Sequence, residues 1–307
     1  MNSLYVLFLT LVFTCGAYAQ EQSTGSVVSI ESSIAKLSRP DKYREGSEEL
    51  RKKGKAALKD LFKAAKDKSS SKAQRVGAML LFGDIAGRDK TTGEREVSSS
   101  EINIFYEKTL SSDPDESMRQ TAAICMANTG DKSNIPKLRK GLEDKSSKVK
   151  ARAAWALAKL GDMSGKEAAL NALEDKDAGA QIVAVEAIEA IGDKTLIPNL
   201  QGMMKSKDVG VRLNAKLALK RLEAKNLSGE SKIAYFSDVL KDDEPEAAQW
   251  AVKKLVEEIN TNGTSRASAV KALKECADDK SGRNSYFAAK WLNQLYSQGK
   301  VSEAEIK

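Results

Sequence analysis

Side chains able to carry catalysis or hold a metal are few in this sequence. The 307 residues include three cysteines and no histidine. Without an imidazole, the sequence excludes Ser-His and Cys-His nucleophiles, His-ligated zinc and haem, and di-iron sites built on Glu-x-x-His. Three cysteines cannot make a Cys₄ zinc site, and no phosphate loop, G-x-S-x-G or paired-carboxylate motif occurs. We therefore expect no catalytic residue, no cofactor and no metal.

The second chemical feature is a concentration of lysine near the start of the chain. Between Lys36 and Arg75 there are 14 Lys and Arg against 6 Asp and Glu. Five lysines in this segment follow helical spacing: Lys52, Lys55, Lys59, Lys63 and Lys66. They are either the solvated side of a terminal capping helix or a contact for an anionic surface, such as lipid headgroups, cell-wall polymer or an acidic protein.

The elements that position these residues follow from an internal repeat. Gly-Asp recurs with a spacing of 31 residues, at Gly130-Asp131, Gly161-Asp162 and Gly192-Asp193. Before each pair, apolar residues recur at i, i+4, i+7, i+8 and i+11, which is one face of a helix. A shorter helix precedes each of these. Each unit is therefore predicted to be helix A, turn, helix B, turn, with Gly in the left-handed position after helix B and Asp capping the next helix.

The repeat extends outward in weaker form, which predicts the fold class. We count about seven helical pairs between residues 44 and 297, with a longer polar loop from Asp89 to Ser100 and the best repeats over 113–223. Each pair buries one face only against its neighbours, so the pairs must stack. The prediction is an all-α protein, an α-solenoid.

The repeats resemble a known family. Residues 118–131 read MRQTAAICMANTGD and residues 149–162 read VKARAAWALAKLGD. Both are similar to the V-R-x-x-A-A-x-A-L-x-x-L-G-D signature of HEAT repeats of the short, phycobilisome-lyase-like type. The resemblance implies a helical superhelix, and most members of the family are interaction scaffolds. Some resemble bilin lyases, and one branch, deoxyhypusine hydroxylase, holds di-iron through His-Glu pairs, which the absence of histidine excludes.

One position of helix B carries a polar series. Arg119, Lys150 and Arg212 are in register, and Gln181 interrupts them. The series is either a cationic ladder for an acidic partner or, as we favour, a structural ladder. In the structural case its partners would be the aspartates of the Gly-Asp turns, Asp131, Asp162 and Asp193.

The cysteines fit the same repeat. Cys125 stands where other repeats have alanine, which predicts a small buried side chain. Cys276 lies about five repeats away, and in a solenoid only neighbouring repeats touch. We therefore expect both thiols to be unpaired.

The B helices are apolar nearly all round. Burial on three sides, by the paired helix and both neighbours, is the simpler explanation. The alternative is an apolar concave groove for a protein segment. Its lining would be Trp155, Ile182, Val185, Leu213, Leu217 and Trp250.

The two ends of the chain are expected to lie outside the solenoid. Residues 1–19 carry no charge, have an apolar run too short for a bilayer, and end in an A-x-A pattern before Gln20, which predicts a signal peptide. Cys15 leaves a lipoprotein anchor as an alternative. Residues 20–43 are expected to be a polar linker and 298–307 a polar tail.

Together these features predict an exported, non-enzymatic scaffold, in a bacterial periplasm or secreted, that binds protein through the concave helix-B face. The alternatives are a surface-attachment protein that uses the basic helix on an anionic envelope component, and a bilin-lyase-like enzyme. We expect no nucleic-acid partner and no membrane span after signal cleavage.

Overall fold

The computed structural model describes residues 28–88, 99–261, 263–279, 282 and 284–306. The chain divides into two compact units, residues 1–191 and 192–307, here called unit 1 and unit 2. The predicted signal peptide, Cys15 included, lies outside the described residues. Within them, every helix is too short or too polar to cross a bilayer.

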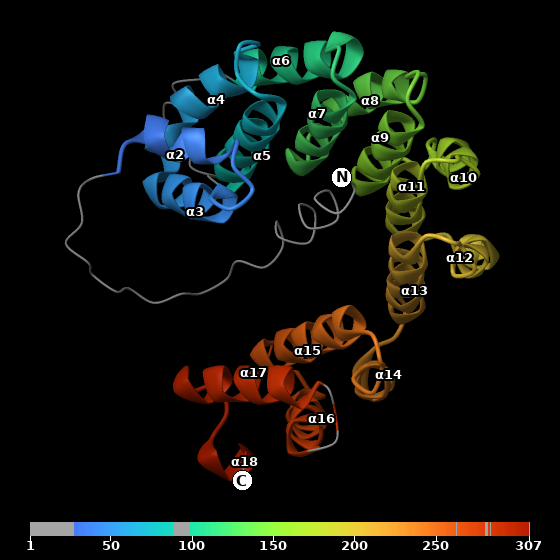
Figure 1. Cartoon of the computed structure of the whole chain (residues 1–307). Helices are drawn as coiled ribbons and strands as arrows, with labels where there is room; N and C mark the ends of the chain where they lie inside the picture. Colours follow the sequence, from blue (N-terminus) through green and yellow to red (C-terminus); the bar gives the residue numbers. More distant parts are fainter. Residues whose placement is uncertain (1–27, 89–98, 262, 280–281, 283, 307) are drawn as a thin grey trace. The chain divides into compact units, whose positions relative to one another are not determined.

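Unit 1 is built of helices that pack in sequence order (Figure 1). They are α2 (Ile30–Lys36), α3 (Tyr43–Lys53), the 3₁₀ turn η2 (Gly54–Ala57), α4 (Leu58–Lys66), α5 (Lys72–Arg88), α6 (Ser99–Ser112), α7 (Glu116–Asn128), η3 (Lys132–Asn134), α8 (Ile135–Gly141), α9 (Ser147–Lys159), α10 (Lys166–Leu173) and α11 (Ala178–Ile191).

Unit 2 continues the same alternation of helices. They are η4 (Lys194–Leu196), α12 (Ile197–Met203), α13 (Val209–Ala224), α14 (Gly229–Val239), α15 (Pro245–Asn260), α16 (Arg266–Asp278), α17 (Ser285–Ser297) and α18 (Glu303–Ile306).

The helices form antiparallel pairs that stack within each unit. In unit 1 the second helices of successive pairs touch one another, α5 against α7, α7 against α9 and α9 against α11. In unit 2 α13 touches α15 and α15 touches α17. From α4/α5 to α16/α17 the described residues contain seven pairs. The predicted all-α solenoid of stacked pairs is therefore confirmed.

The Gly-Asp turns explain why α7, α9 and α11 stop where they do. Gly130, Gly161 and Gly192 have φ of +69°, +87° and +70°, which disfavours any side chain there. The aspartates of two of these turns then cap the following 3₁₀ turns, because Asp131 accepts from the Ser133 amide and Asp193 from the Thr195 amide, each at 2.9 Å.

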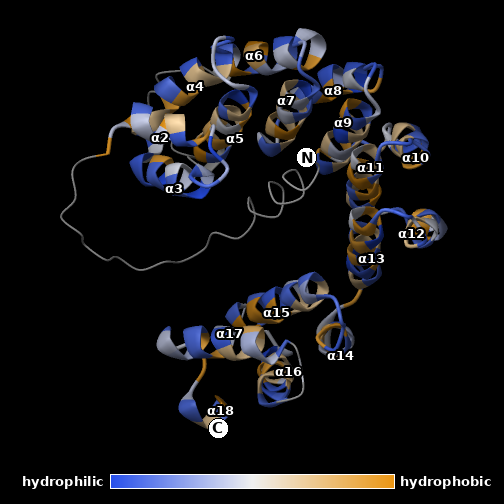
Figure 2. Cartoon of the chain, in the orientation of Figure 1, coloured by the Kyte–Doolittle hydropathy of each residue, from blue (hydrophilic) through white to orange (hydrophobic). Residues whose placement is uncertain are grey.

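Each unit has an apolar core between its helices. One cluster runs from Ile34 to Leu160 in unit 1, and another from Ala224 to Val301 in unit 2. Figure 2 shows apolar residues along α5, α11 and α15. These long helices are apolar on several sides because they contact their own partner and their neighbours in the stack.

Two regions near the N-terminus differ from expectation. Residues 20–43 were expected to be a linker, but residues 30–36 form α2, and Ile34 and Leu37 are buried. The polar composition did not indicate this helix, because polar residues attach it to α3 through ion pairs. Lys36 Nζ lies 2.7 Å from Glu45 and 2.6 Å from Glu49. Helix α6 begins at Ser99, inside the expected loop 89–100.

The C-terminal residues also pack on the fold. Val301 is buried, and α18 lies against α16 through an ion pair between Arg266 and Glu305 at 2.5 Å. The expected polar tail 298–307 therefore contains a short docked helix.

Candidate protein-binding surface

The repeat places one residue of each of six B helices, from α5 to α15, at an equivalent, half-buried position. In unit 1 these are Leu80 on α5, Ile124 on α7, Trp155 on α9 and Glu186 on α11, which we call the unit 1 row. Their helices touch in that order. Three of the four side chains are apolar, and the fourth, on α11, is a carboxylate. Leu217 and Trp250 hold the equivalent positions in unit 2 and are also half-buried.

The predicted groove residues divide between burial and partial exposure. Val185 is buried, at 1% exposure, so it cannot contact a partner. Trp155, Ile182, Leu213, Leu217 and Trp250 are half-buried. Three-sided burial thus accounts for Val185, as it does for Ala151 and Ala154, which are fully buried. The structure brings Trp155 and Ile182 together on contacting helices of unit 1.

Trp155 of the unit 1 row lies against a buried, charged side chain. Arg152 is 1% exposed, and its Nη1 donates to Oε2 of Glu186 at 2.7 Å. Its guanidinium carbon lies 5.5 Å from the ring centroid of Trp155, and Lys159 Nζ lies 6.0 Å from the same ring. These contacts favour the aromatic face of Trp155 as a cation–π acceptor and fix its position.

Sequence reasoning missed Arg152 and Glu186, although a signal was present. The positions equivalent to Arg152 hold Thr121, Val183 and Asn214. A single arginine at a position otherwise small or apolar indicates a specific partner, and the partner is the acidic member of the next repeat.

In unit 2 the equivalent aromatic residue has an apolar support. The Trp250 ring meets Phe236 edge to face, with centroids 5.2 Å apart. Leu217 and Trp250 both pack against the unit 2 core. The same row position is therefore filled by aromatic residues that are held differently in the two units.

The polar series on helix B is structural, but its partners differ from those predicted. Arg119, Gln181 and Arg212 each donate to the carbonyl six residues earlier, at Asp113, Asp175 and Ser206, over 2.8 to 3.0 Å. Gln181 therefore keeps the shared bond instead of breaking the series. Arg119 also pairs with both carboxylate oxygens of Asp144, at 2.7 and 3.0 Å.

The predicted acidic partners have other roles. Asp131 and Asp193 cap 3₁₀ turns, as described above. Asp162 accepts from the Ser164 amide at 2.8 Å and pairs with Arg139. The pairing of Arg119, Lys150 and Arg212 with the Gly-Asp turns was therefore wrong, because short-range turn bonds already occupy those carboxylates.

The predicted lysine stripe is exposed along its whole length, on more than one helix. Lys52 lies at the end of α3, Lys55 in η2, and Lys59, Lys63 and Lys66 on α4. The break falls at Gly54, whose φ is +56°. Lys66 Nζ lies 4.8 Å from the centroid of the Phe62 ring.

Neither thiol in the described residues is paired. Cys125 and Cys276 are free, and Cys125 is fully enclosed in the core, as predicted. Burial raises the pKa of the Cys125 thiol to about 12, although a hydrogen bond with Tyr106 lowers it. Such a thiol is inert at neutral pH. Across the same residues, His, Cys, Asp and Glu form no group that could hold a metal ion.

A small hollow lies between α9 and α10. It encloses 280 Å³ and is lined in part by Lys150, Glu167 and Asn171. Glu167 and Asn171 are exposed, so the hollow is open to solvent. It lies just below the usual size of a small-molecule site, roughly 300–1,000 Å³.

Comparison with known proteins identifies the repeats. The family described as HEAT repeats matches residues 106–178 and 167–256. No curated protein matches the chain.

Two solved structures are similar in outline. One is the complex of CpcE and CpcF of phycocyanin lyase from Nostoc sp. PCC7120, with 18% identity, 92% of this chain and 100% of that chain covered, and a TM-score of 0.43. The other is an engineered protein, with 19% identity, 87% of this chain and 78% of that chain covered, and a TM-score of 0.38.

Proposed function

We propose that this chain, whose residues 106–256 match HEAT repeats, is an exported, non-enzymatic scaffold that binds a protein partner through helix-B residues. One observation carries the proposal. Leu80, Ile124 and Trp155 occupy equivalent, half-buried positions on three B helices that touch in succession. An ordered apolar row of this kind suits a protein segment better than a small molecule, because it is long and shallow.

The length of the row supports one kind of occupant. Packed helices lie about 8–10 Å apart, so four successive B helices span roughly 30 Å. That distance matches about five turns of an α-helix. We infer that the partner contributes an amphipathic helix whose apolar side faces the row, with Trp155 as the anchor. Rigidly held Trp residues at the centre of an interface carry a large share of its binding energy.

The carboxylate at the α11 end of the row predicts where the partner segment carries a basic residue. Glu186 is half-buried and already bonded to Arg152. Its second oxygen can accept a bond from a basic residue of the partner. The proposed partner segment is therefore apolar over the α5, α7 and α9 positions and basic at the α11 end.

The test is affinity capture from the native envelope with a matched pair of variants. Trp155→Ala removes the anchor, whereas Met163→Ala removes an apolar side chain that is 48% exposed outside the row. We expect a co-purifying protein to be captured by the parental chain and by Met163→Ala, and to be lost with Trp155→Ala. Circular dichroism must show the same helix content for all three. Retention of the partner by Trp155→Ala would refute the proposal.

Export is supported by the sequence of residues 1–19, with its short apolar run and A-x-A ending. N-terminal sequencing of the protein purified from its native cells tests it. We expect the first residue to be Gln20, and a lipid-modified Cys15 would instead assign the anchored form. Protein found in the cytosolic fraction with residues 1–19 still attached would contradict export.

A further inference from the structure

The net positive charge of this protein is concentrated in one short stretch. Residues 51–72 contain nine Lys and Arg and two Asp, a net charge of +7. The whole chain also has a net charge of +7, so all the other residues together are neutral. An electrostatic field of one sign therefore arises from η2, α4 and their flanks, not from the chain as a whole.

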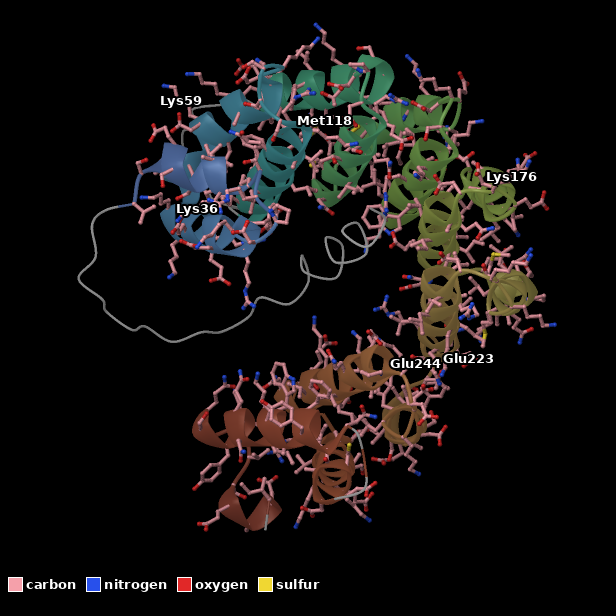
Figure 3. The ribbon with its side chains drawn as sticks, viewed as in Figure 1. Lys36, Lys59, Met118, Lys176, Glu223 and Glu244 are labelled. Atoms are coloured by element: carbon pink, nitrogen blue, oxygen red, sulfur yellow. The ribbon has the colours of Figure 1, made fainter. Side chains whose placement is uncertain are left out.

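Helix α4 carries its charged side chains on one side and its core side chains on the other. Leu61, Phe62 and Ala65 are buried, whereas Lys59, Lys63 and Lys66 are exposed on the other side of the helix. Lys52 and Lys55 are exposed on the preceding turns. We call these five residues the lysine face. Figure 3 labels Lys59 on α4 within it.

Four of the five lysines in the lysine face form no ion pair within the described part of the chain. In the described part of the chain, no carboxylate lies within ion-pair distance of Lys52, Lys59, Lys63 or Lys66, whereas nearby Lys36 is held between Glu45 and Glu49. The adjacent Asp67 carboxylate accepts bonds from Ser69 and Ser70 at 2.7 and 2.9 Å, and it forms no ion pair with Lys63 or Lys66. Four ammonium groups are therefore available to an external anion.

We propose that the lysine face is a docking surface for the anionic headgroups of a lipid bilayer. Its five charges are all ammonium groups, which are strongly hydrated point charges without the bidentate geometry that arginine offers a carboxylate. Among the exposed large apolar side chains of the described residues, none falls between residues 51 and 72. An interface with a protein usually has an apolar anchor. Diffuse attraction to a layer of lipid phosphates needs only exposed charge.

This surface is separate in sequence and position on the fold from the unit 1 row. It involves α3, η2 and α4, whereas the row lies on α5, α7, α9 and α11. The lysine face thus serves a role apart from protein binding, because it places the scaffold at a lipid surface.

The test is co-sedimentation of the purified chain with vesicles. One set contains equal parts phosphatidylcholine and phosphatidylglycerol, and a second set contains phosphatidylcholine alone, which accounts for any apolar binding. The variant Lys59→Gln/Lys63→Gln/Lys66→Gln removes three charges from the lysine face. The control Lys132→Gln/Lys140→Gln/Lys176→Gln removes three exposed charges elsewhere in unit 1.

Each lysine near an anionic surface contributes enough that losing three should weaken binding about 100-fold. We expect this loss for the lysine-face variant, a small change for the control, and parental binding for Trp155→Ala. Binding should also fall steeply as salt is raised. If the two triple variants lose vesicle binding equally, the loss comes from the lower net charge of the protein and not from the lysine face, and the proposal is overturned. Failure of the parental chain to prefer the anionic vesicles would overturn it too, and would leave an acidic protein as the ligand of the lysines.

Discussion

Arg152 on α9 donates to Glu186 on α11 across 2.7 Å, although the arginine side chain is only 2% exposed. The guanidinium Nε has no partner in the described residues, so Glu186 provides the ion pair on which this buried cation depends. A buried charge is tolerated only while it is paired. The pair therefore joins two successive B helices, and the Arg152 guanidinium also lies against the Trp155 ring.

Removing the carboxylate should cost unit 1 much of its stability. We expect Glu186→Ala to lower the free energy of unfolding by about 2–4 kcal/mol, because Arg152 is left buried without its counter-charge. The Glu186 side chain is 22% exposed, so the expected loss of stability is smaller than for a fully buried pair. Urea unfolding followed by circular dichroism measures the change.

A matched control and a double variant sharpen this prediction. Glu167→Ala removes an exposed carboxylate from the neighbouring α10 and should change stability by less than about 0.5 kcal/mol. The double variant Arg152→Met/Glu186→Leu replaces the pair by apolar side chains and should recover most of the loss. If the double variant is no more stable than Glu186→Ala, unpaired charge is not the cause.

The repeat pattern by itself does not predict the Arg152–Glu186 pair. The 31-residue repeat predicted the helices, the turn glycines and the buried Cys125, because a repeated local pattern reports each residue's own environment. A contact between α9 and α11 depends instead on rotamers of two long side chains one repeat apart. The same limit explains the wrong partners given to Arg119, since the pattern shows its face of the helix but not how far the guanidinium reaches.

A second ion pair makes unit 2 sensitive to acid. Asp242 Oδ1 lies 2.7 Å from Lys216 Nζ, and Oδ2 lies 3.0 Å from Lys220 Nζ. Burial acts to raise the pKa of this carboxyl, but the two ammonium groups and the Glu244 amide outweigh it. Together they lower the pKa from 3.8 to about 2.

The sign of the pH dependence follows from that shift. The folded state has the lower pKa, so the stabilisation is complete above pH 4 and is lost as the pH falls toward 2. We expect Asp242→Asn to lose about 1–2 kcal/mol at neutral pH and to show a flatter decline in stability between those pH values. Asp243→Asn, at the exposed neighbouring position, is the control and should follow the parental curve. Identical acid profiles for both variants would contradict the role of Asp242.

The start of α10 approaches α9, helix B of the preceding repeat, through a glycine. A methyl group on Gly165 would lie 2.5 Å from the Ala154 Cα, which is backbone and cannot rotate away. We expect Gly165→Ala to destabilise the protein by about 1–3 kcal/mol through overpacking. Gly202 is the comparison, because a methyl group there meets nothing within 4 Å. Gly202→Ala should be neutral or stabilise by up to about 1 kcal/mol, through higher helix propensity. A thermal melt compares them, and equal effects would exclude the contact with Ala154.

The N-terminal helix α2 was hidden from sequence analysis for a physical reason. It has seven residues, too few for a periodic pattern, and of these only Ser33 and Ile34 are buried. Its position is fixed by contacts from α3, including Ser33 Oγ to Glu49 Oε2 at 2.7 Å. Helices stabilised by tertiary contacts in this way carry little local signal.

The two described thiols should differ sharply in reactivity. Cys125 is 1% exposed, its Sγ lies 3.5 Å from the Met79 carbonyl oxygen, and burial raises its pKa to about 12. Cys276 is only half-buried, and burial also raises its pKa. Since the thiolate is the reactive species, native protein treated with iodoacetamide at pH 8 should be alkylated at Cys276 long before Cys125. Peptide mass spectrometry reads each site separately. In urea both should react at similar rates, because unfolding removes the difference in burial. Early labelling of Cys125 in the native protein would mean that the α5–α7 contact opens readily, and that the core of unit 1 is less closed than its packing indicates.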